Sequence, residues 1–278
     1  MKAYTSNNIR NIAVLGHGGK GKTTLCEAML YIAGASDRLG RVADGNTVLD
    51  FDSEEKRRKS SVSSAIAALE WDNTKLNIID APGLFDFEGG AAEAVRAAEA
   101  VLIVTSAGSG VDVGTEKAFR AAEKKGAAKF FAVTKTDSDH RNFYKTFDAL
   151  KEVYGNKLCP TIIPYMEGNI TKCYVNLMTG MAFSYDENGK ATKVPVPEDS
   201  VIEEMTSAFM EAVATTDDAL MEKFFEGEKF TKEEILKGLC IGIFDGSIYP
   251  VYAVSGLTCA GVDQLLYGLA WSVSCAFG

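Results

Sequence analysis

The sequence predicts an α/β fold, in which a doubly wound, mostly parallel sheet carries helices on both faces and is interrupted by an inserted α+β subdomain. Strand-like apolar runs alternate with helical stretches up to about residue 157, and a Gly-rich loop joins the first run to the first helix. Beyond Cys159 this alternation gives way to short strands, turns and acidic helices. We therefore expect residues 1–157 and 248–278 to form the core, and residues 158–247 to form the inserted subdomain.

The first elements are a strand, a loop and a helix. Residues 12–16, IAVLG, are an aliphatic run typical of a short buried strand. After the loop, apolar residues recur at helical spacing and give one apolar face; they are Leu25, Ala28, Met29 and Ile32. Residues 35–60 are polar and show no clear period, which predicts a long flexible loop.

Four strands are predicted in the middle of the core. Residues 66–71 and 75–80 form a hairpin pattern, with a turn at Asp72-Asn73-Thr74. Residues 100–107 and 129–135 are further apolar strands, each preceded by an Ala-rich or charged helical stretch. A helical stripe follows and ends at Gly155-Asn156; its members are Phe143, Phe147, Leu150 and Tyr154.

The predicted insertion mixes strands with acidic helices. Asp186 to Lys190, DENGK, is a hairpin signal, and an acidic helical stretch extends from about Glu198 to Phe225. Thr231 and Glu234 form a capping-box start for a further helix, which continues to Phe244. The core then resumes with a strand at 249–255 and a closing helix from Val262 to Cys275.

Composition narrows the class of protein. A formal net charge of −9 disfavours a general nucleic-acid coat, and no apolar run has membrane-spanning length. Six cysteines without a CxxC pair indicate reduced thiols in a cytoplasmic protein without a zinc site. With only His17 and His140, a His-based metal site or triad is nearly excluded. The one basic run, 56–59, is either a solvated mobile loop or a local RNA contact.

The Gly-rich loop fits a phosphate-binding pattern. Residues 16–23, GHGGKGKT, match G-x-x-x-x-G-K-[ST] between a strand and a helix. Glycines let several N–H groups point at phosphate oxygens, and the helix N-terminus adds its positive end. Lys22 is expected to reach the β and γ oxygens, and the Thr23 hydroxyl to bind Mg²⁺.

Two other motifs favour guanine nucleotides. Thr134-Lys135-Thr136-Asp137 follows a strand at the edge where open α/β sheets bind ligands. A carboxylate at Asp137 can accept both N1–H and the 2-amino group of guanine, whereas adenine has no such donor pair. Asp80-Ala-Pro-Gly83 ends another strand; Asp80 is expected to hold Mg²⁺ through water, and the Gly83 N–H to contact the γ-phosphate.

Together these motifs resemble the guanine-nucleotide domain of the translational GTPases, most closely elongation factor G and its paralogues, with ribosomal-protection tetracycline-resistance proteins as near relatives. RNIAVLGHGGKGKTT, LEWDNTKLNIIDAPGLFDF, VTKTD and AVSGL occur in the family's order over essentially the whole chain. The resemblance implies a P-loop GTPase core, GTP/GDP and Mg²⁺ as ligands, and the ribosome, including its factor-binding site and stalk protein, as partner.

The resemblance also assigns roles by position. The implied nucleotide-binding residues are His17, Gly18, Gly19, Lys20, Gly21, Lys22, Thr23, Thr24, Thr134, Lys135, Asp137, Ser255, Gly256 and Leu257. The implied magnesium ligands are Thr23, Ser61 and Asp80, and the catalytic positions are Lys22, Asp80, Gly83 and Leu84. Sequence-specific nucleic-acid binding and membrane contact are not expected.

Four positions depart from the family. Its Arg-Gly-Ile-Thr switch motif falls on residues 58–61, where Ser61 keeps only the hydroxyl. Gly19 stands where Asp is common, and Thr134 where Asn is usual. Leu84 replaces the His that orients the attacking water, and losing such a group typically costs ~2.7–4 kcal/mol, a factor of roughly 10² to 10³ in rate.

Three functions therefore remain open. The first is a GTP/GDP switch at the ribosome in translation elongation, with impaired hydrolysis. The second is a fully active translocation or ribosomal-protection GTPase, and the third is a regulatory ribosome-binding protein that does not need hydrolysis.

The insertion carries three acidic residues, Glu203, Glu204 and Glu211, which form either a contact with the ribosomal stalk protein or a solvated helix face. Since the chain stops at Gly278 and the family continues, we expect either an excised fragment or a truncated protein.

Overall fold

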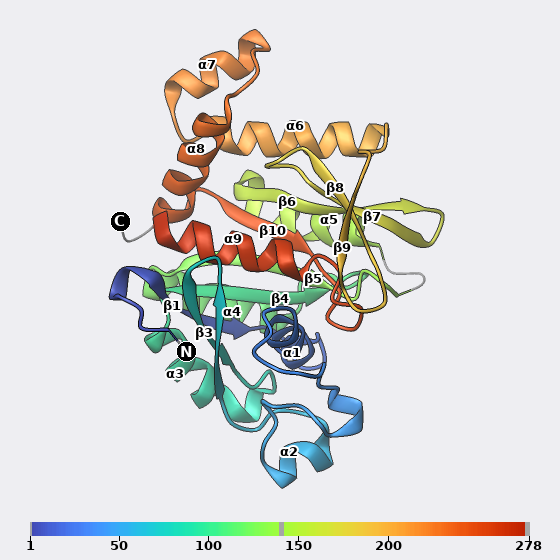
Figure 1. Cartoon of the computed structure of the whole chain (residues 1–278). Helices are drawn as coiled ribbons and strands as arrows, with labels where there is room; N and C mark the ends of the chain where they lie inside the picture. The colour runs from blue at the N-terminus through green and yellow to red at the C-terminus, as the bar shows by residue number, and fades with distance from the viewer. Residues whose placement is uncertain (1, 139–141, 276–278) are drawn as a thin grey trace.

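The computed structural model, which describes residues 2–138 and 142–275, is built around one mixed sheet (Figure 1). In the described part of the chain this sheet has ten strands in the order β2-β3-β1-β4-β5-β10-β6-β7-β8-β9. From β3 to β6 all neighbouring strands pair in parallel, as expected where helices connect them. β2 is antiparallel to β3, and β6 to β9 form an antiparallel meander. The mixed α/β fold class is therefore confirmed.

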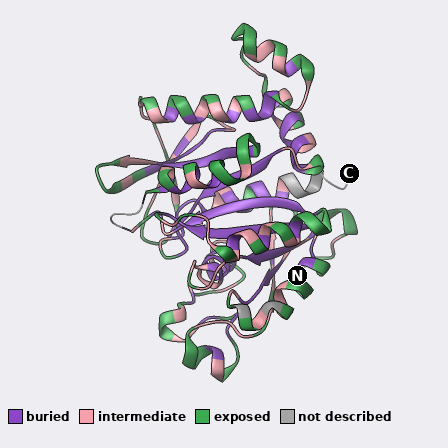
Figure 2. Ribbon diagram, turned by 180° about the vertical axis from the view of Figure 1, so that it is seen from behind, coloured by how far each residue is buried: buried purple, intermediate pink, exposed green. Residues whose placement is uncertain are grey.

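The strands have the following bounds: β1 Ile9–Leu15, β2 Ala65–Trp71, β3 Thr74–Asp80, β4 Ala100–Ser106, β5 Ala128–Thr134, β6 Leu158–Glu167, β7 Ile170–Asn176, β8 Met181–Tyr185, β9 Ala191–Val194 and β10 Tyr249–Ala253. Every residue of β4, β5 and β10 is buried, and these strands lie in the middle of the sheet (Figure 2). A strand that is covered on both faces consists almost entirely of apolar residues, and such apolar runs predicted these strands from the sequence.

The α-helices have the following bounds: α1 Lys22–Ile32, α2 Ser53–Arg58, α3 Glu88–Ala97, α4 Val113–Lys125, α5 Phe143–Tyr154, α6 Ser200–Ala214, α7 Asp218–Glu226, α8 Lys232–Asp245 and α9 Val262–Cys275. Short 3₁₀ turns lie at Ser6–Asn8, Val42–Asp44, Phe85–Phe87 and Gly155–Lys157. α1 and α9 contact each other on one face of the core sheet, while α3 and α4 lie together on the other (Figures 1 and 2).

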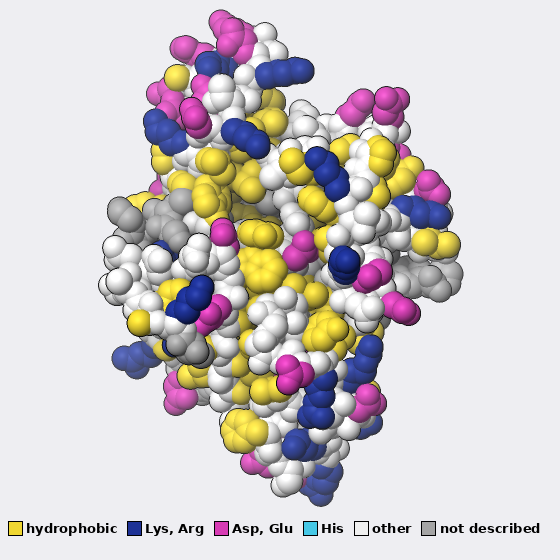
Figure 3. Space-filling view, in the orientation of Figure 1, with side chains coloured by type: hydrophobic (Ala, Val, Ile, Leu, Met, Phe, Trp, Pro, Cys, Tyr) yellow, Lys and Arg dark blue, Asp and Glu magenta, His cyan; other side chains and the backbone are white. Residues whose placement is uncertain are grey.

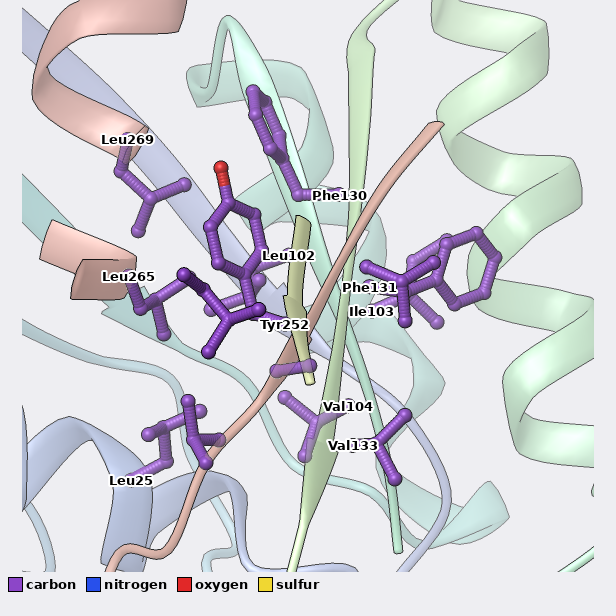
Figure 4. Packing of buried hydrophobic residues seen from close by; sticks show 14 of the residues in the cluster. Leu25, Leu102, Ile103, Val104, Phe130, Phe131, Val133, Tyr252, Leu265 and Leu269 are labelled. Atoms are coloured by element: carbon purple, nitrogen blue, oxygen red, sulfur yellow. The ribbon is translucent and has the colours of Figure 1, made fainter. Parts of the chain in front are cut away.

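The core is the layer between α1, α9 and the central strands. Figure 4 shows Leu25 of α1 and Leu265 and Leu269 of α9 facing the sheet at β4, β5 and β10. Phe131 of β5 points to the opposite face, where it stacks against Phe119 of α4 at 6.4 Å between ring centroids. The sheet is therefore packed on both faces, and its strand ends are fixed in position.

The sequence predicted some local elements and missed others. The hairpin is confirmed, since Trp71 pairs with Thr74 and both loop residues, Asp72 and Asn73, have positive φ as a tight two-residue turn requires. The flexible loop predicted over 35–60 is wrong in part, because α2 lies inside it behind a capping box from Asp52. The single acidic helical stretch is two helices, α6 and α7, separated by a short break at 215–217.

The segment 158–247 continues the sheet of the core. β6 pairs in parallel with β10, the last strand of the core, and β7 to β9 extend the sheet outward from β6. On the face shown in Figure 3, hydrophobic side chains gather in the middle of the surface. A cavity of about 590 Å³ lies between α8, α9 and this meander, lined in part by Met178, Phe183 and Tyr267. The boundaries of an inserted subdomain stay a prediction.

Two further findings concern the cysteines and the membrane. Four buried thiols are free: Cys26, Cys159, Cys173 and Cys259. Cys240 is disulfide-bonded, so the prediction of reduced thiols is wrong at that residue. Among the described residues, no helix is both long enough and apolar enough to span a bilayer.

Candidate functional site

The phosphate loop lies between β1 and α1 and depends on glycine at its first position. Gly16 has φ of +143°, and a Cβ there would lie 2.2 Å from the carbonyl oxygen of Val104 in β4. Any side chain would therefore force the loop away from the sheet. Gly19 and Gly21 also have positive φ, and Gly21 leads directly into α1. The loop can therefore present backbone N–H groups beside the N-terminus of α1.

Lys22, at the start of α1, is held inside this loop. Its side chain is buried, and its Nζ donates to the carbonyl oxygens of Gly16 and His17, each at 3.1 Å. Burial lowers the pKa of Lys22, and the charge of Asp80 partly opposes that effect. The ammonium group is thus positioned by backbone oxygens and desolvated, a state in which it interacts strongly with an anion.

Two predicted loop residues are turned toward α4. The Lys20 Nζ lies 2.9 Å from Asp112 Oδ2 and 2.9 Å from Ser109 Oγ. His17 packs against Gly114, where a Cβ would lie 2.6 Å from the Cα of His17. In this arrangement His17 and Lys20 can offer a phosphate their backbone N–H groups.

Four oxygen-bearing side chains converge beside Lys22. Thr23 Oγ1 lies 2.7 Å from Asp80 Oδ2 and 3.0 Å from Ser61 Oγ, and Ser61 Oγ lies 2.9 Å from Asp50 Oδ1. The two hydroxyls supply only two hydrogens for these three contacts. A further proton or a cation is needed to make the third contact attractive. Asp80 Oδ1 is buried and has no hydrogen-bond partner among the described residues.

This cluster fits a magnesium ion. The pKa of Asp80 is raised to about 7, chiefly by burial and in smaller part by the nearby charges of Asp50 and Glu27, while Thr23 and Lys22 oppose the rise. A divalent cation would take the place of the missing proton and keep the carboxylate ionised. Mg²⁺ prefers hydroxyl and carboxylate oxygens and keeps several waters, so it does not need a cage of acidic residues. The described residues contain no cluster of three or more His, Cys, Asp or Glu able to hold a metal by themselves.

The loop that carries Asp50 is anchored to α1 by a buried carboxylate. Glu27 Oε1 accepts the backbone N–H groups of Val48 and Leu49, at 2.8 and 2.9 Å. Glu27 has no exposed surface, and a Cβ on Gly40 would lie 2.0 Å from its second oxygen. Sequence reasoning missed both Glu27 and Asp50. The one available signal was a Glu placed among the apolar residues of the first helix.

The proposed guanine motif lies at the end of β5 and is tied to the phosphate loop. Thr134 Oγ1 donates to the carbonyl oxygen of Lys20 at 2.6 Å, so Thr134 ties the end of β5 to the phosphate loop. Lys135 has a φ of +60°, and its Nζ donates to the carbonyl oxygen of Gly19 at 2.7 Å. Asp137 follows as an exposed carboxylate.

The loop after β10 completes this side of the site. Ser255 is fully buried, and its Oγ accepts the backbone N–H of Thr258 at 3.1 Å. A Cβ on Gly256 would lie 3.0 Å from the carbonyl oxygen of Thr24 in α1, so this loop lies directly on the helix. Leu257 is exposed beside it. Both predicted base-binding loops therefore reach the same end of the sheet as the phosphate loop.

The residues predicted to bind the nucleotide line two different hollows. The first, of about 230 Å³, is lined by Gly18, Gly19, Gly21, Lys22, Thr23, Thr24, Val42, Asp50, Lys59, Ser60, Ser61, Gly83 and Lys135. The second, of about 300 Å³, is lined by Asp137, Thr258 and residues of β7 and of the loop after β8. The structure thus brings the phosphate and magnesium residues together and places Asp137 at an adjoining hollow. Lys59 and Asp50 join the first hollow without having been predicted.

Gly83 and Leu84 lie beside the phosphate loop. A Cβ on Gly83 would lie 2.1 Å from Lys22 Nζ and 2.9 Å from the carbonyl oxygen of Gly16, so only glycine fits there. Leu84 lies against Gly18 and lines a separate apolar cavity of about 370 Å³ between α3 and α4. Its side chain is 40% exposed and carries no group that can donate a hydrogen bond. The backbone of His17 packs against Gly114 of α4, and His140 lies outside the described residues.

The fold and this site together define a phosphate-loop nucleotide-binding protein. A family model described as the elongation factor Tu GTP binding domain matches residues 7–273. This chain therefore belongs to the family of elongation factor Tu GTP-binding domains, and its domain is of the elongation factor G-like kind.

Known proteins agree with this assignment. Two proteins from Mycobacterium tuberculosis, of strains CDC 1551 / Oshkosh and ATCC 25618 / H37Rv, are each named elongation factor G-like protein and are 33% identical over 261 residues. The match covers 93% of this chain and 36% of each relative, so the chain spans about a third of their length. A crystal structure of a protein from Thermus thermophilus superimposes with a TM-score of 0.88 at 35% identity, covering 96% of this chain and 40% of that one.

Proposed function

We propose that this chain is the guanine-nucleotide switch of an elongation factor G-like protein acting at the ribosome in translation elongation, with GTP hydrolysis slowed by Leu84. The observation that carries the proposal is the convergence of Lys22, Thr23, Ser61 and Asp80 beside the Gly-rich loop, with Leu84 next to it in place of the family's His. The roles assigned below to single residues belong to this proposal.

The phosphate loop and Lys22 would bind the β- and γ-phosphates. Lys22 is already held by the carbonyl oxygens of Gly16 and His17, so little side-chain freedom is lost when an anion binds. Thr23 and Ser61 would hold Mg²⁺ directly and Asp80 through water, and the metal would neutralise charge that develops on the phosphates. The Gly83 backbone would contact the γ-phosphate, so that its loss on hydrolysis releases the following residues.

The base would be read by Asp137 and Lys135. The Asp137 carboxylate can accept two hydrogen bonds from guanine but finds no donor pair on adenine. The Lys135 stem can lie along the base plane while its ammonium holds Gly19. Ser255, Gly256 and Leu257 would close the other side of the base.

Slow hydrolysis follows from the chemistry of Leu84. Phosphoryl transfer depends on positioning and charge stabilisation, and an isobutyl group supplies neither to the attacking water. Leu84 also lies against Gly18 and lines the α3–α4 cavity together with alanines, Lys117 and Arg120. We therefore propose nucleotide-dependent switching with a weak chemical step.

A fully active GTPase is the second candidate, and Lys59 favours it. This residue lines the same hollow as Lys22, Ser61 and Gly83, two residues before the proposed magnesium ligand. A cation placed there could stabilise charge in the transition state without an imidazole.

The ribosomal stalk would bind at the outer helices. A groove of about 720 Å³ runs between α6, α7 and the segment before α6. Its apolar residues include Ile202, Met210 and Phe224, and its rim carries Glu198 and Glu203. An apolar floor with an acidic rim suits a basic amphipathic helix of a partner. Glu204 and Glu211 are also exposed on α6.

Isothermal titration of the protein with GDP, GTP and ATP in the presence of Mg²⁺ tests the proposed binding. We expect GDP and GTP to bind at least 100-fold more tightly than ATP, because a site built to hydrogen-bond one ligand rejects an analogue that lacks those groups by roughly 10⁴ to 10⁵. Submicromolar ATP binding without guanine preference would contradict the proposal. Guanine binding together with ribosome binding that is indifferent to GTP or GDP would instead support a regulatory ribosome-binding protein.

A further inference from the structure

Strand β7, in the segment 158–247, bonds to residues 134–137, one of the two loops that the proposed function assigns to the guanine base. Tyr174 of β7 reaches Thr136, which stands between Lys135 and Asp137, with 2.7 Å between the two hydroxyl oxygens. Thr136 Oγ1 in turn donates to the carbonyl oxygen of Val254, the residue before Ser255, at 3.0 Å. Thr136 thus ties the two loops together, and Tyr174, from outside the core, bonds to the hydroxyl that makes this tie.

We propose that Tyr174 is a positioning residue for guanine recognition, which acts through Thr136 on Asp137. This inference rests on the proposed function, because it assigns Tyr174 to the same base site. It gives the segment 158–247 a role in nucleotide specificity in addition to any partner that it binds.

The direction of the hydrogen bonds makes Tyr174 the donor. Thr136 has a single hydroxyl hydrogen, and the Val254 carbonyl oxygen, which can only accept, takes it. Tyr174 must therefore donate its own hydrogen to Thr136. Both Tyr174 and Thr136 are 4% exposed, so water has little access to replace the bond. Leaving a buried hydroxyl unpaired is costly.

A second bond from the same strand holds the backbone of the motif. Thr171 Oγ1 donates to the carbonyl oxygen of Thr136 at 2.9 Å. The preceding residue, Lys135, has a left-handed backbone with φ of +60°, which costs energy in a residue other than glycine and persists only where the surroundings hold it. The bonds from Tyr174 and Thr171 fix the peptide that leads directly into Asp137.

Tyr174 is itself held from two sides. Its ring meets Tyr185 of β8 edge-on at 5.6 Å between centroids, and Tyr185 donates to Asp263 Oδ1 of α9 at 2.6 Å. Gly261, after the Ser255 loop, would place a Cβ 3.6 Å from the Tyr174 ring. The hydroxyl is therefore presented to Thr136 by a packed ring with little freedom to turn away.

The chemistry of the base supplies a selective readout. Guanine offers Asp137 both N1–H and the 2-amino group, whereas hypoxanthine offers N1–H alone. If Asp137 is held less firmly, the affinity for GDP should fall more than the affinity for IDP, because GDP makes two hydrogen bonds with this carboxylate and IDP makes one. Loss of Tyr174 positioning should therefore lower the ratio of GDP to IDP affinity, whereas a general loss of stability would weaken both equally.

The test is Tyr174→Phe in the full chain, with titrations of GDP and IDP in Mg²⁺ buffer. We expect GDP affinity to fall roughly three- to tenfold, the usual effect of one net hydrogen bond, and the GDP/IDP ratio to fall with it. Thr171→Val should shift the ratio in the same direction by less, and it keeps the inference testable if Tyr174→Phe does not fold. Tyr144→Phe is the matched control, since its hydroxyl donates to the Pro164 carbonyl oxygen at 2.6 Å and contacts neither loop.

The outcomes separate the two claims. If the parent chain prefers GDP to ADP but Tyr174→Phe keeps the parental GDP affinity and GDP/IDP ratio, the inference is overturned and the proposed function stands. The inference also fails if Tyr174→Phe and Tyr144→Phe weaken GDP and IDP by the same factor. A parent chain that does not prefer GDP to ADP would overturn the proposed function and the inference together.

Discussion

At the scale of single residues, the oxygen cluster beside Lys22 has more short oxygen–oxygen contacts than hydroxyl hydrogens to fill them. Thr23, Ser61, Asp50 and Asp80 make three short oxygen contacts with two hydroxyl hydrogens between them. The third contact becomes attractive when either a carboxyl group carries a proton or a cation is bound. The same cluster can therefore exist in a protonated form without metal and in an ionised form with Mg²⁺.

This balance predicts a pH dependence of stability for the metal-free, nucleotide-free protein. The pKa of Asp80 is about 7 in the folded state against 3.8 for the ordinary group, chiefly through burial. The folded protein then binds the proton more tightly than the unfolded chain, so this contribution is full below pH 3.8 and is lost as the pH rises to about 7.

The measurement is the Tm in chelator between about pH 5 and pH 8, for the parent and for Asp80→Asn. We expect the parent to lose Tm relative to the variant as the pH rises, because Asn does not titrate. Added Mg²⁺ should restore the parent at high pH and leave Asp80→Asn unchanged. A difference in Tm between the two proteins that stays constant across this range would contradict the assignment.

At the scale of elements, the loop between α1 and β2 is the part of the site that can change state. It is pinned near its middle, at Val48 and Leu49, by Glu27, and near its end by the Ser61 contacts with Thr23 and Asp50. The short helix α2 between these points carries exposed Lys and Arg side chains, which gather over the lower end of the molecule in Figure 3. Release of Ser61 would therefore free the basic end of the loop while Glu27 still holds residues 48 and 49.

Removal of the first anchor should loosen this loop. Glu27→Ala leaves the N–H groups of Val48 and Leu49 without their acceptor, at about 1–3 kcal/mol for each buried donor that stays unpaired. We expect faster amide exchange over residues 40–61 in the nucleotide-free protein. Glu27→Gln keeps one carbonyl oxygen and is the control, so it should stay close to the parent. Equal exchange in all three proteins would show that Glu27 does not anchor the loop.

The elements also show what a sequence can reveal. α1, the β2–β3 hairpin and α5 were predictable because local periodicity and turn residues agree with the fold. α2 was missed because six residues are too few to show an apolar period, although its capping box was visible. Glu27 and Tyr174 could not be predicted, since their partners lie far along the chain or across the sheet.

At the scale of the whole molecule, one sheet connects the nucleotide site to the outer helices. The core strands bring the phosphate loop, the Gly83 turn and the two loops proposed to bind guanine to one edge, and β6 to β9 extend the same sheet toward α6 (Figure 1). The alternation of strands and helices predicted the fold class, but the position of β6 beside β10 is a long-range pairing without a local signal. Through Tyr174, this extension bonds to Thr136, the residue before the proposed base-binding Asp137.

The central claim is that this GTP-binding domain switches but lacks an efficient chemical step. The most direct measurement is phosphate release from GTP with and without ribosomes, for the protein and for Leu84→His. We predict slow release from the parent and a ribosome-dependent gain of roughly 10² to 10³ in the variant, with GTP affinity unchanged. A parent that already turns over rapidly with ribosomes, and gains nothing from Leu84→His, would contradict the claim and favour the fully active GTPase.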